Sequence, residues 1–133
     1  MRFMMFMYPQ IDEADWNPSA EDVAEMTRYN EELRKAGMLL ALDGLHPPTE
    51  GASVEFAADG ATTVTDGPFA EAKEVVGGYW VIQARSREEA VEWAKRCPGR
   101  GCRIEVRRVF EMEDFPEDVQ AAVEGTGPGW SEA

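Results

Sequence analysis

The sequence predicts one α+β domain in which a strand, helix, strand pattern occurs twice around an inserted hairpin. Two segments, residues 2–8 and 79–84, are apolar on both alternating faces, which is typical of central strands. After each of them, a segment with helical apolar spacing opens on a serine suited to capping. At 133 residues the chain fits a single domain, which buries roughly two-thirds of its unfolded surface.

The first half of the pattern is expected to cover residues 2–42. Ser19 is placed to cap a helix that runs to about Ala36, and the acidic residues that follow Ser19 complement the helix dipole. Gly37 can adopt the left-handed conformation that ends the helix, and residues 38–42 then form a second strand. The residues expected on the inward face of the helix are Val23, Met26, Asn30 and Leu33.

A β-hairpin is predicted between the two halves. Residues 52–57 and 62–65 flank Asp59 and Gly60, a pair that supplies the positive φ values of tight turns. Before the hairpin, two prolines follow His46 directly. Because prolines remove the hydrogen-bond donors of a strand, His46 is expected to lie on a loop.

The second half of the chain repeats the first. Residues 70–76 are expected to form a short helix before the strand at residues 79–84, and a capping box at Ser86 then begins a longer helix. The buried face of that helix is expected to carry Ala90, Trp93, Ala94 and Cys97. Residues 102–110 form the last strand, whose apolar face is expected to carry Cys102, Ile104, Val106 and Phe110.

This order of elements is that of a ferredoxin-like fold, in which two helices cover one face of an antiparallel sheet. The other face also needs a cover, because both central strands are apolar on that side. We therefore expect two copies of the chain to pack sheet against sheet as an isologous homodimer. Residues 1–112 would form this domain, and residues 113–133 a C-terminal extension with a short helix and a glycine-rich, partly flexible end.

The composition excludes several classes of partner. The formal net charge is −13, from 26 acidic and 13 basic residues, so neither nucleic acid nor an anionic membrane surface is expected to bind. The apolar N-terminal run is too short for a signal peptide or a membrane span, which predicts a cytoplasmic location. Cys97 and Cys102 are interpreted as reduced thiols, and together with the single His46 they do not make a zinc set of ordinary spacing. Neither a metal nor a cofactor is predicted.

Residues 63–79, TVTDGPFAEAKEVVGGY, contain D-G-P-F, K-E and G-G-Y in one run. This run resembles the signature of the YCII-related family, often called the DGPF family, and residues 44–48, GLHPP, fit the same resemblance. The likeness extends over most of residues 1–112. It implies a ferredoxin-like fold that forms a dimeric α/β barrel, with an active-site cleft near the motif in each subunit.

The resemblance does not imply one known reaction. Many similar proteins have no established activity, and some are found near or fused to sigma factors of the extracytoplasmic-function class. A few similar proteins eliminate chloride from chlorinated hydroxyquinols. The resemblance therefore suggests a small polar cyclic or aromatic molecule as the ligand and a sigma factor as a candidate protein partner.

His46 and Asp66 are the candidate catalytic residues. His46 is the one side chain whose ordinary pKa lies near neutrality, which suits a general acid or base. Asp66 could orient the imidazole and set its tautomer, as in the His–Asp dyads proposed in similar YCII proteins. Both residues also have structural readings, because an Asp before Gly-Pro commonly fixes a turn and a lone histidine is commonly structural.

Lys73, Glu74 and Tyr79 are the candidate substrate-binding residues. Lys73 and Glu74 could hold a polar ligand, or they could form exposed ion pairs worth only about 0 to 1 kcal/mol. Tyr79 could pack in the core or extend its hydroxyl into a cleft. Gly77 and Gly78, which precede it, would permit either a bulge or the close approach of a ligand to the backbone, and the bulge is favoured.

Two functions fit these residues. The first is a cofactor-independent enzyme that uses acid–base chemistry on a small polar cyclic or aromatic molecule, with His46 moving the proton and Asp66 orienting it. The alternative is a non-catalytic dimeric module that binds a ligand or regulates an extracytoplasmic-function sigma factor. The sequence contains neither a glycine-rich phosphate loop nor a nucleophile elbow, so it favours no better-defined catalytic class.

Overall fold

A computed structural model describes residues 1–67 and 74–123. The strands within these ranges are β1 (Arg2–Tyr8), β2 (Leu39–Gly44), β3 (Ala52–Phe56), β4 (Thr62–Asp66), β5 (Gly78–Gln83) and β6 (Arg103–Arg108). The α-helices there are α1 (Ala20–Lys35), α2 (Arg87–Lys95) and α3 (Glu117–Val123). Short 3-10 turns lie at Glu13–Asp15, Pro48–Glu50 and Met112–Asp114.

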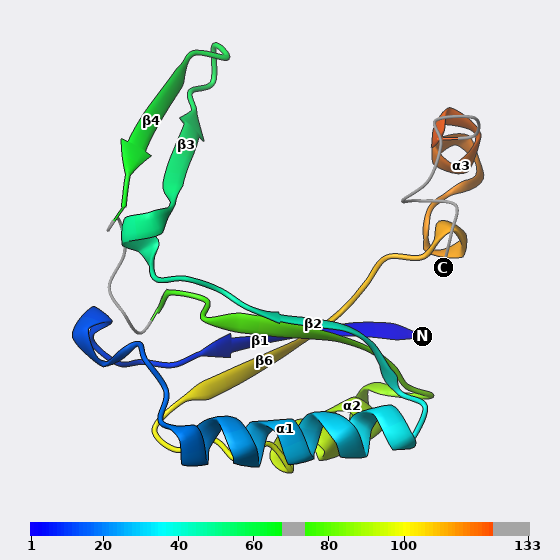
Figure 1. Cartoon of the computed structure of the whole chain (residues 1–133). Helices are drawn as coiled ribbons and strands as arrows, with labels where there is room; N and C mark the ends of the chain where they lie inside the picture. The colour runs from blue at the N-terminus through cyan, green and yellow to red at the C-terminus, as the bar shows by residue number, and fades with distance from the viewer. Residues whose placement is uncertain (68–73, 124–133) are drawn as a thin grey trace.

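The main sheet has the strand order β2-β5-β1-β6, and every neighbouring pair in it is antiparallel. Helices α1 and α2 cover one face of this sheet, whereas the β3–β4 hairpin and α3 rise from the opposite side at its two ends (Figure 1). The arrangement agrees with a ferredoxin-like α+β fold that carries an inserted hairpin. The helix predicted over residues 70–76 falls largely on residues 68–73, which lie outside the described residues.

The predicted helix boundaries are confirmed by their capping contacts. Ser19 and Ser86 each accept a backbone N–H bond of 3.1 Å, from Asp22 and from Glu89 respectively. Gly37 has a φ of 74° just after α1, which is the left-handed geometry expected at this helix end. Each of these capping features involves residues only a few positions apart in the chain, which is why the sequence predicts them well.

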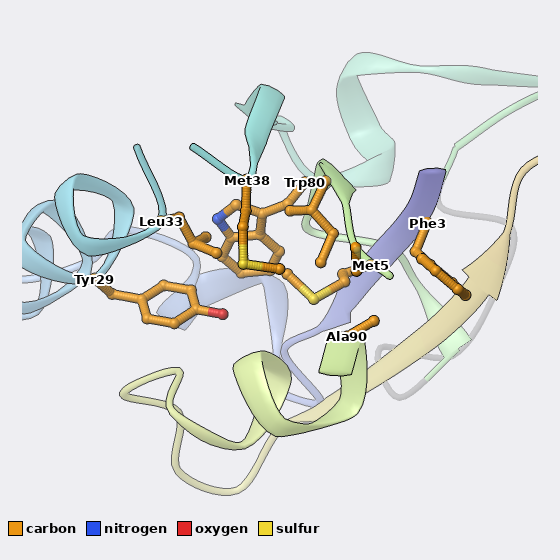
Figure 2. Packing of buried hydrophobic residues seen from close by; sticks show 9 residues of the cluster. Phe3, Met5, Tyr29, Leu33, Met38, Trp80 and Ala90 are labelled. Atoms are coloured by element: carbon orange, nitrogen blue, oxygen red, sulfur yellow. The ribbon is translucent and has the colours of Figure 1, made fainter. Parts of the chain in front are cut away.

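The hydrophobic core lies between the main sheet and the two helices. The side chains of Phe3 and Met5 from β1 and of Trp80 and Ile82 from β5 point toward α1 and α2 and share one cluster with Leu33 of α1. Figure 2 shows this cluster, with the Trp80 indole stacked among Met38, Leu33 and Met5. The register of β1 on β5 therefore places every second side chain of each strand in the core.

The inward face of α1 differs from the prediction at one position. Val23 is 49% exposed, and Tyr29 is buried instead. The Tyr29 ring packs edge-to-face on Trp80 with 5.9 Å between centroids, and its hydroxyl donates to the Trp93 carbonyl at 2.7 Å. An aromatic ring with a satisfied hydroxyl can enter the core at a position that looks polar in a hydrophobicity pattern.

The end of the last strand also differs from the prediction. Strand β6 stops at Arg108, and Phe110, which was expected on its apolar face, is 58% exposed. Phe110 stacks instead on Phe115, with 4.8 Å between ring centroids. The chain leaves the sheet after β6 to begin the C-terminal extension, so the alternation of the strand no longer applies there (Figure 1).

We call the face of the main sheet opposite the helices the open face. The strand register places one row of side chains across all four strands on this face: Asp43, Tyr79, Phe6 and Glu105. The adjacent row consists of Ala41, Val81, Met4 and Arg107. The central members of both rows are only half-buried, so this face is apolar at its centre and charged toward its edges.

Candidate functional site

His46 lies on the loop between β2 and the hairpin, as the sequence predicts. The loop is anchored just before His46, because the Leu45 N–H donates to the Gly77 carbonyl at 2.9 Å and the Leu45 carbonyl accepts the Trp16 indole N–H at 3.1 Å. It is anchored again just after His46 by the turn Pro48–Glu50. The exposed imidazole is therefore held on a short, doubly fixed segment.

The loop separates two cavities, and His46 lines both of them. The first cavity has a volume of about 500 Å³ and lies on the side of the hairpin, with walls that include Ala52, Glu74, Val75 and Val76. The second cavity has a volume of about 560 Å³ and lies on the side of the segment before α1, with walls that include Glu13, Trp16, Pro18 and Gly77. Leu45, Pro47 and Glu50 border both cavities as well. Each volume lies in the range of small-molecule sites.

Carboxylates accompany the imidazole in each cavity. Glu50 borders both, Glu74 borders the first, and Glu13 borders the second. Glu13 is held in place because its carboxylate accepts hydrogen bonds from the backbone N–H and the hydroxyl of Thr49. Within the described residues, no hydrogen bond or ion pair joins His46 to another side chain, so its two ring nitrogens are available to a ligand.

Gly77 determines how closely the walls of the second cavity approach each other. A Cβ atom on Gly77 would lie 2.9 Å from Cδ of Pro9 and 3.5 Å from the Trp16 ring. The Gly77 N–H donates to the Met7 carbonyl at 2.7 Å, so the backbone is hydrogen-bonded where it passes beneath these rings. The glycine thus serves close packing of protein groups, and the bulge predicted at this position is wrong.

Asp66 ends β4 at the base of the hairpin. It lies opposite Ala52 in the strand register, and Ala52 is part of the wall of the first cavity. The Asp66 side chain is exposed and borders neither of the two cavities that His46 lines. In the part of the chain that the structure describes, no hydrogen bond connects Asp66 to His46, so the dyad stays a prediction.

The three candidate substrate-binding residues are distributed differently. Glu74 borders the first cavity with His46, and Lys73 lies outside the described residues. Tyr79 is half-buried on the open face, where its hydroxyl donates to Oδ2 of Asp43 at 3.0 Å. The hydrogen bond to the Asp43 carboxylate, together with its negative charge, raises the pKa of Tyr79.

A second tyrosine–carboxylate pair lies on the same face. The Tyr8 hydroxyl donates to Oε1 of Glu105 at 2.9 Å, which raises the pKa of Tyr8. The Arg103 guanidinium lies 4.1 Å from the centroid of the Tyr8 ring, in cation–π geometry. Phe6 separates this pair from the Tyr79 pair in the row across the sheet.

Several groups of the site could not be found from the sequence. Glu13 and Trp16 are more than 25 residues from His46 in the chain, and Asp43 meets Tyr79 only through strand pairing. One local signal was present, because Asp43 is a charged residue at the end of a strand close to His46. The contacts of Glu13 and Trp16 join loop segments that are distant in the chain, so they carry no such local signal.

Two further properties concern metal binding and membranes. Among residues 1–67 and 74–123, no group of three or more His, Cys, Asp or Glu side chains is arranged to hold a metal ion. In the same part of the chain, no helix combines the length and the apolar character that crossing a membrane requires.

Comparison with known proteins identifies the family. The family model described as the YCII-related domain matches residues 1–113, which include the main sheet, the hairpin and the His46 loop. The chain is also 32% identical over 82 residues to an uncharacterised protein of Rhizobium meliloti (strain 1021). That alignment covers 60% of this chain and 65% of the relative, slightly less than two-thirds of the relative's length. The chain therefore belongs to the YCII-related family.

Proposed function

We propose that the protein is a cofactor-independent enzyme that uses His46 as an acid–base group on a small polar cyclic or aromatic molecule. The observation that carries this proposal is the position of His46 on the fixed loop between two cavities of about 500 and 560 Å³. An imidazole, the side chain that most often serves as a general acid or base, is thus exposed to ligand-sized spaces on both sides.

The lining of the first cavity fits a ring with polar substituents. Leu45, Val75 and Val76 offer apolar contacts, whereas His46 and the carboxylates of Glu50 and Glu74 offer hydrogen bonds to hydroxyl groups. Carboxylate acceptors favour ligands that carry O–H or N–H donors. A hydroxylated ring bound here would present a donor proton to the imidazole.

Asp66 has an orienting role in this proposal. Its support is its place beside Ala52, at the point where the hairpin meets the wall of the first cavity. From there, a change in side-chain conformation or the arrival of a ligand would be needed to bring the carboxylate to the imidazole. The catalytic role of His46 does not depend on this step, because the unprotonated ring nitrogen can accept a proton directly from the ligand.

The single histidine makes the experiment direct, because its ring protons give one set of imidazole signals in the NMR spectrum. A panel of hydroxyquinols, catechols and cyclic hydroxy acids would be titrated while these signals are followed, and compounds that shift them would be assayed for turnover. His46→Ala should lower that turnover by about 10²- to 10⁴-fold. Val23→Ala, a change on the exposed side of α1, is the control and should leave turnover unchanged.

The same assay separates the two candidate residues. A loss of activity in both His46→Ala and Asp66→Ala supports the dyad, whereas a loss in His46→Ala alone leaves the histidine acting without Asp66. Undiminished turnover in both variants would refute the acid–base mechanism.

We also propose that two copies of the chain pack through their open faces to form the dimeric α/β barrel. The support is the half-buried apolar centre of that face, formed by Met4, Phe6 and Val81, which the helices leave uncovered. A closed pair of sheets would remove this surface from water and give each cavity a neighbouring subunit.

A second candidate function is a non-catalytic module that binds a regulatory protein such as an extracytoplasmic-function sigma factor. The hairpin favours a protein contact, because Val54, Phe56 and Val64 lie on one of its faces and Phe56 is 73% exposed. Recovery of a sigma factor with the wild-type chain and equally with His46→Ala, but not with Phe56→Ser, would support this function over catalysis.

A further inference from the structure

Cys97 and Cys102 lie at the two ends of the turn that connects α2 to β6. Cys97 follows the last residue of α2 by two positions, and Cys102 directly precedes β6. Both are free thiols and both are half-buried. The chain between them turns back on itself, with the Gly99 N–H donating to the Cys97 carbonyl at 2.8 Å and Gly101 at a φ of 64°.

The two thiols border one cavity, which is separate from the His46 site. This cavity has a volume of about 520 Å³ between α2 and β6, with Ala94, Ile104 and Val106 among its apolar walls. Both cysteines line it, together with Gly99. A small reagent that enters this space therefore lies beside both cysteines.

The Cys102 sulfur lies over the turn itself. A Cβ atom on Gly99 would be 2.5 Å from Sγ of Cys102, so the sulfur occupies the space that any other residue would fill. Gly99 is only two residues from Cys97 and is hydrogen-bonded to it. Burial, and secondarily the electrostatic effect of the neighbouring Cys102, raises the pKa of Cys97 to about 12. Gly99 thus links the two residues, because its backbone is hydrogen-bonded to Cys97 and lies against the Cys102 sulfur.

We propose that Cys97 and Cys102 are a redox-active pair that closes into an intramolecular disulfide across this turn. The oxidant is a low-molecular-weight disulfide of the glutathione type. The Cys102 thiolate attacks one sulfur of that disulfide, forms a mixed disulfide and releases one thiolate as the S–S bond of the reagent breaks.

Cys97 completes the reaction as the resolving thiol. It gives its proton to a solvent base, attacks the Cys102 sulfur and releases the second small thiol. Two protein thiols are oxidised, one small disulfide is reduced to two thiols, and the two protons pass to the solvent and the released thiols. Because burial keeps Cys97 protonated, Cys102 is the group that reacts first.

The expected consequence is a covalent link between the C-terminal end of α2 and the start of β6. Both elements border the core, so the oxidised form should unfold at a higher temperature than the reduced form. The link would also restrict the backbone next to Arg103, which stacks on Tyr8 at the edge of the open face.

The position of Arg100 between the two cysteines provides a sharp test. Full-length reduced protein would be incubated in buffers with increasing ratios of oxidised to reduced glutathione, blocked with N-ethylmaleimide and digested with trypsin without reduction. Trypsin cleaves after Arg100, so the two cysteine-containing peptides stay together only if a disulfide joins them. The proposal expects the linked pair of peptides from protein that migrates as a single chain on a non-reducing gel.

Two matched variants identify the order of the steps. Cys97→Ser should accumulate a stable glutathione adduct on Cys102, and Cys102→Ser should react at a rate at least tenfold lower, because its remaining thiol is Cys97, whose pKa is raised. If either serine variant unfolds, the alanine variant at the same position replaces it, with folding verified by its thermal transition.

Three results would overturn the proposal. The first is recovery of the two cysteine-containing peptides unlinked, with N-ethylmaleimide on both, even at the highest ratio of oxidised to reduced glutathione. The second is stable glutathione on both cysteines of the wild-type chain. The third is a disulfide found only between two chains.

Discussion

Gly77 shows how a single residue without a side chain positions the His46 loop. The rings of Pro9 and Trp16 pack against its backbone, and the Trp16 indole in turn holds the Leu45 carbonyl next to His46. A series of contacts thus connects Gly77, which belongs to the family motif, to the candidate catalytic residue His46. The motif thus contributes to the site through packing as well as through any chemistry of Asp66.

Gly77→Ala should therefore disturb the site and destabilise the fold by about 1 to 3 kcal/mol, because the new Cβ must displace Pro9. Urea unfolding measures the loss, and the His46 imidazole signals report the change in the loop. Gly44→Ala is the matched control, because a Cβ there meets nothing within 4 Å. Equal stability of the two variants would show that the close approach at Gly77 does not constrain the loop.

A hydrogen-bonded ion pair ties the segment that follows β6 to the start of β1. The Arg2 guanidinium donates to the Glu111 carboxylate at 2.8 and 3.2 Å, and this hydrogen-bonded pair lowers the pKa of Glu111. The folded pKa therefore lies below the unfolded value of about 4.3. The stabilisation is complete above the unfolded pKa and is lost as the pH falls through the folded pKa.

Glu111→Gln should accordingly destabilise the protein near neutral pH and lose this deficit in acid. The measurement is the free energy of unfolding in urea across the acid limb, for wild type and variant. Glu113→Gln, an exposed neighbour, should follow the wild-type pH dependence. A deficit in Glu111→Gln that stays constant over the whole pH range would contradict the assignment to ionisation.

At the scale of elements, the β3–β4 hairpin stands apart from the rest of the fold. It forms its own two-stranded sheet and carries its exposed face of Val54, Phe56 and Val64 away from the core. An isolated two-stranded hairpin is only marginally stable in water. Strands β1 and β5, by contrast, are each paired on both edges and contribute to the core.

Amide hydrogen exchange should separate these two kinds of strand. The amides of β3 and β4 should exchange orders of magnitude faster than those of β1 and β5, because the hairpin can open without disrupting the core. Peptide-resolved mass spectrometry at low protein concentration is suitable. Protection of the hairpin equal to that of β5 would show that something covers it, and a dependence of protection on protein concentration would identify the cover as a second copy.

The elements could be predicted to the extent that their signals are local. The caps at Ser19 and Ser86 and the turn at Gly37 are short-range contacts, and they are confirmed. Tyr29 could not be placed in the core from hydrophobicity, because its burial depends on a carbonyl that α2 supplies. The exposed position of Phe110 depends on where the chain leaves the sheet, which the alternating pattern of β6 does not indicate.

In the candidate site, too, local features could be predicted from the sequence and long-range contacts could not. The loop position of His46 could be predicted because two adjacent prolines exclude a strand there. The carboxylate of Glu13, the indole of Trp16 and the pairing of Asp43 with Tyr79 come from distant parts of the chain. The Asp43–Tyr79 contact follows from the sheet register, whereas Glu13 and Trp16 reach the site through the fold of the segment between β1 and α1. Neither arrangement carries a local sequence signal.

The whole molecule combines a net charge of −13 with an open sheet face that has an apolar centre. Mutual repulsion of two such chains opposes association, and it weakens as salt screens the charge. Burial of the apolar centre favours association and is not reduced by salt. The proposed dimer should therefore be stronger at higher ionic strength.

Met4→Glu tests the face directly, because it puts a charge in the centre of the open face. The variant should be monomeric at concentrations where the wild type is dimeric, as measured by light scattering coupled to gel filtration. Val23→Glu introduces the same charge on an exposed position of α1 and should not change the mass. A wild-type chain that is monomeric at all concentrations would refute the proposed dimer.

The base of the hairpin has a consequence for how this family can vary. The Gly67 N–H donates to the Gly51 carbonyl at 3.1 Å, so the chain enters and leaves the hairpin at nearly the same point. Direct joining of these two glycines would delete β3 and β4 without moving an end of any core strand. The hairpin is thus a module that one insertion could add and one deletion remove. A relative without it is expected to keep the strand order β2-β5-β1-β6 and the histidine loop beside it.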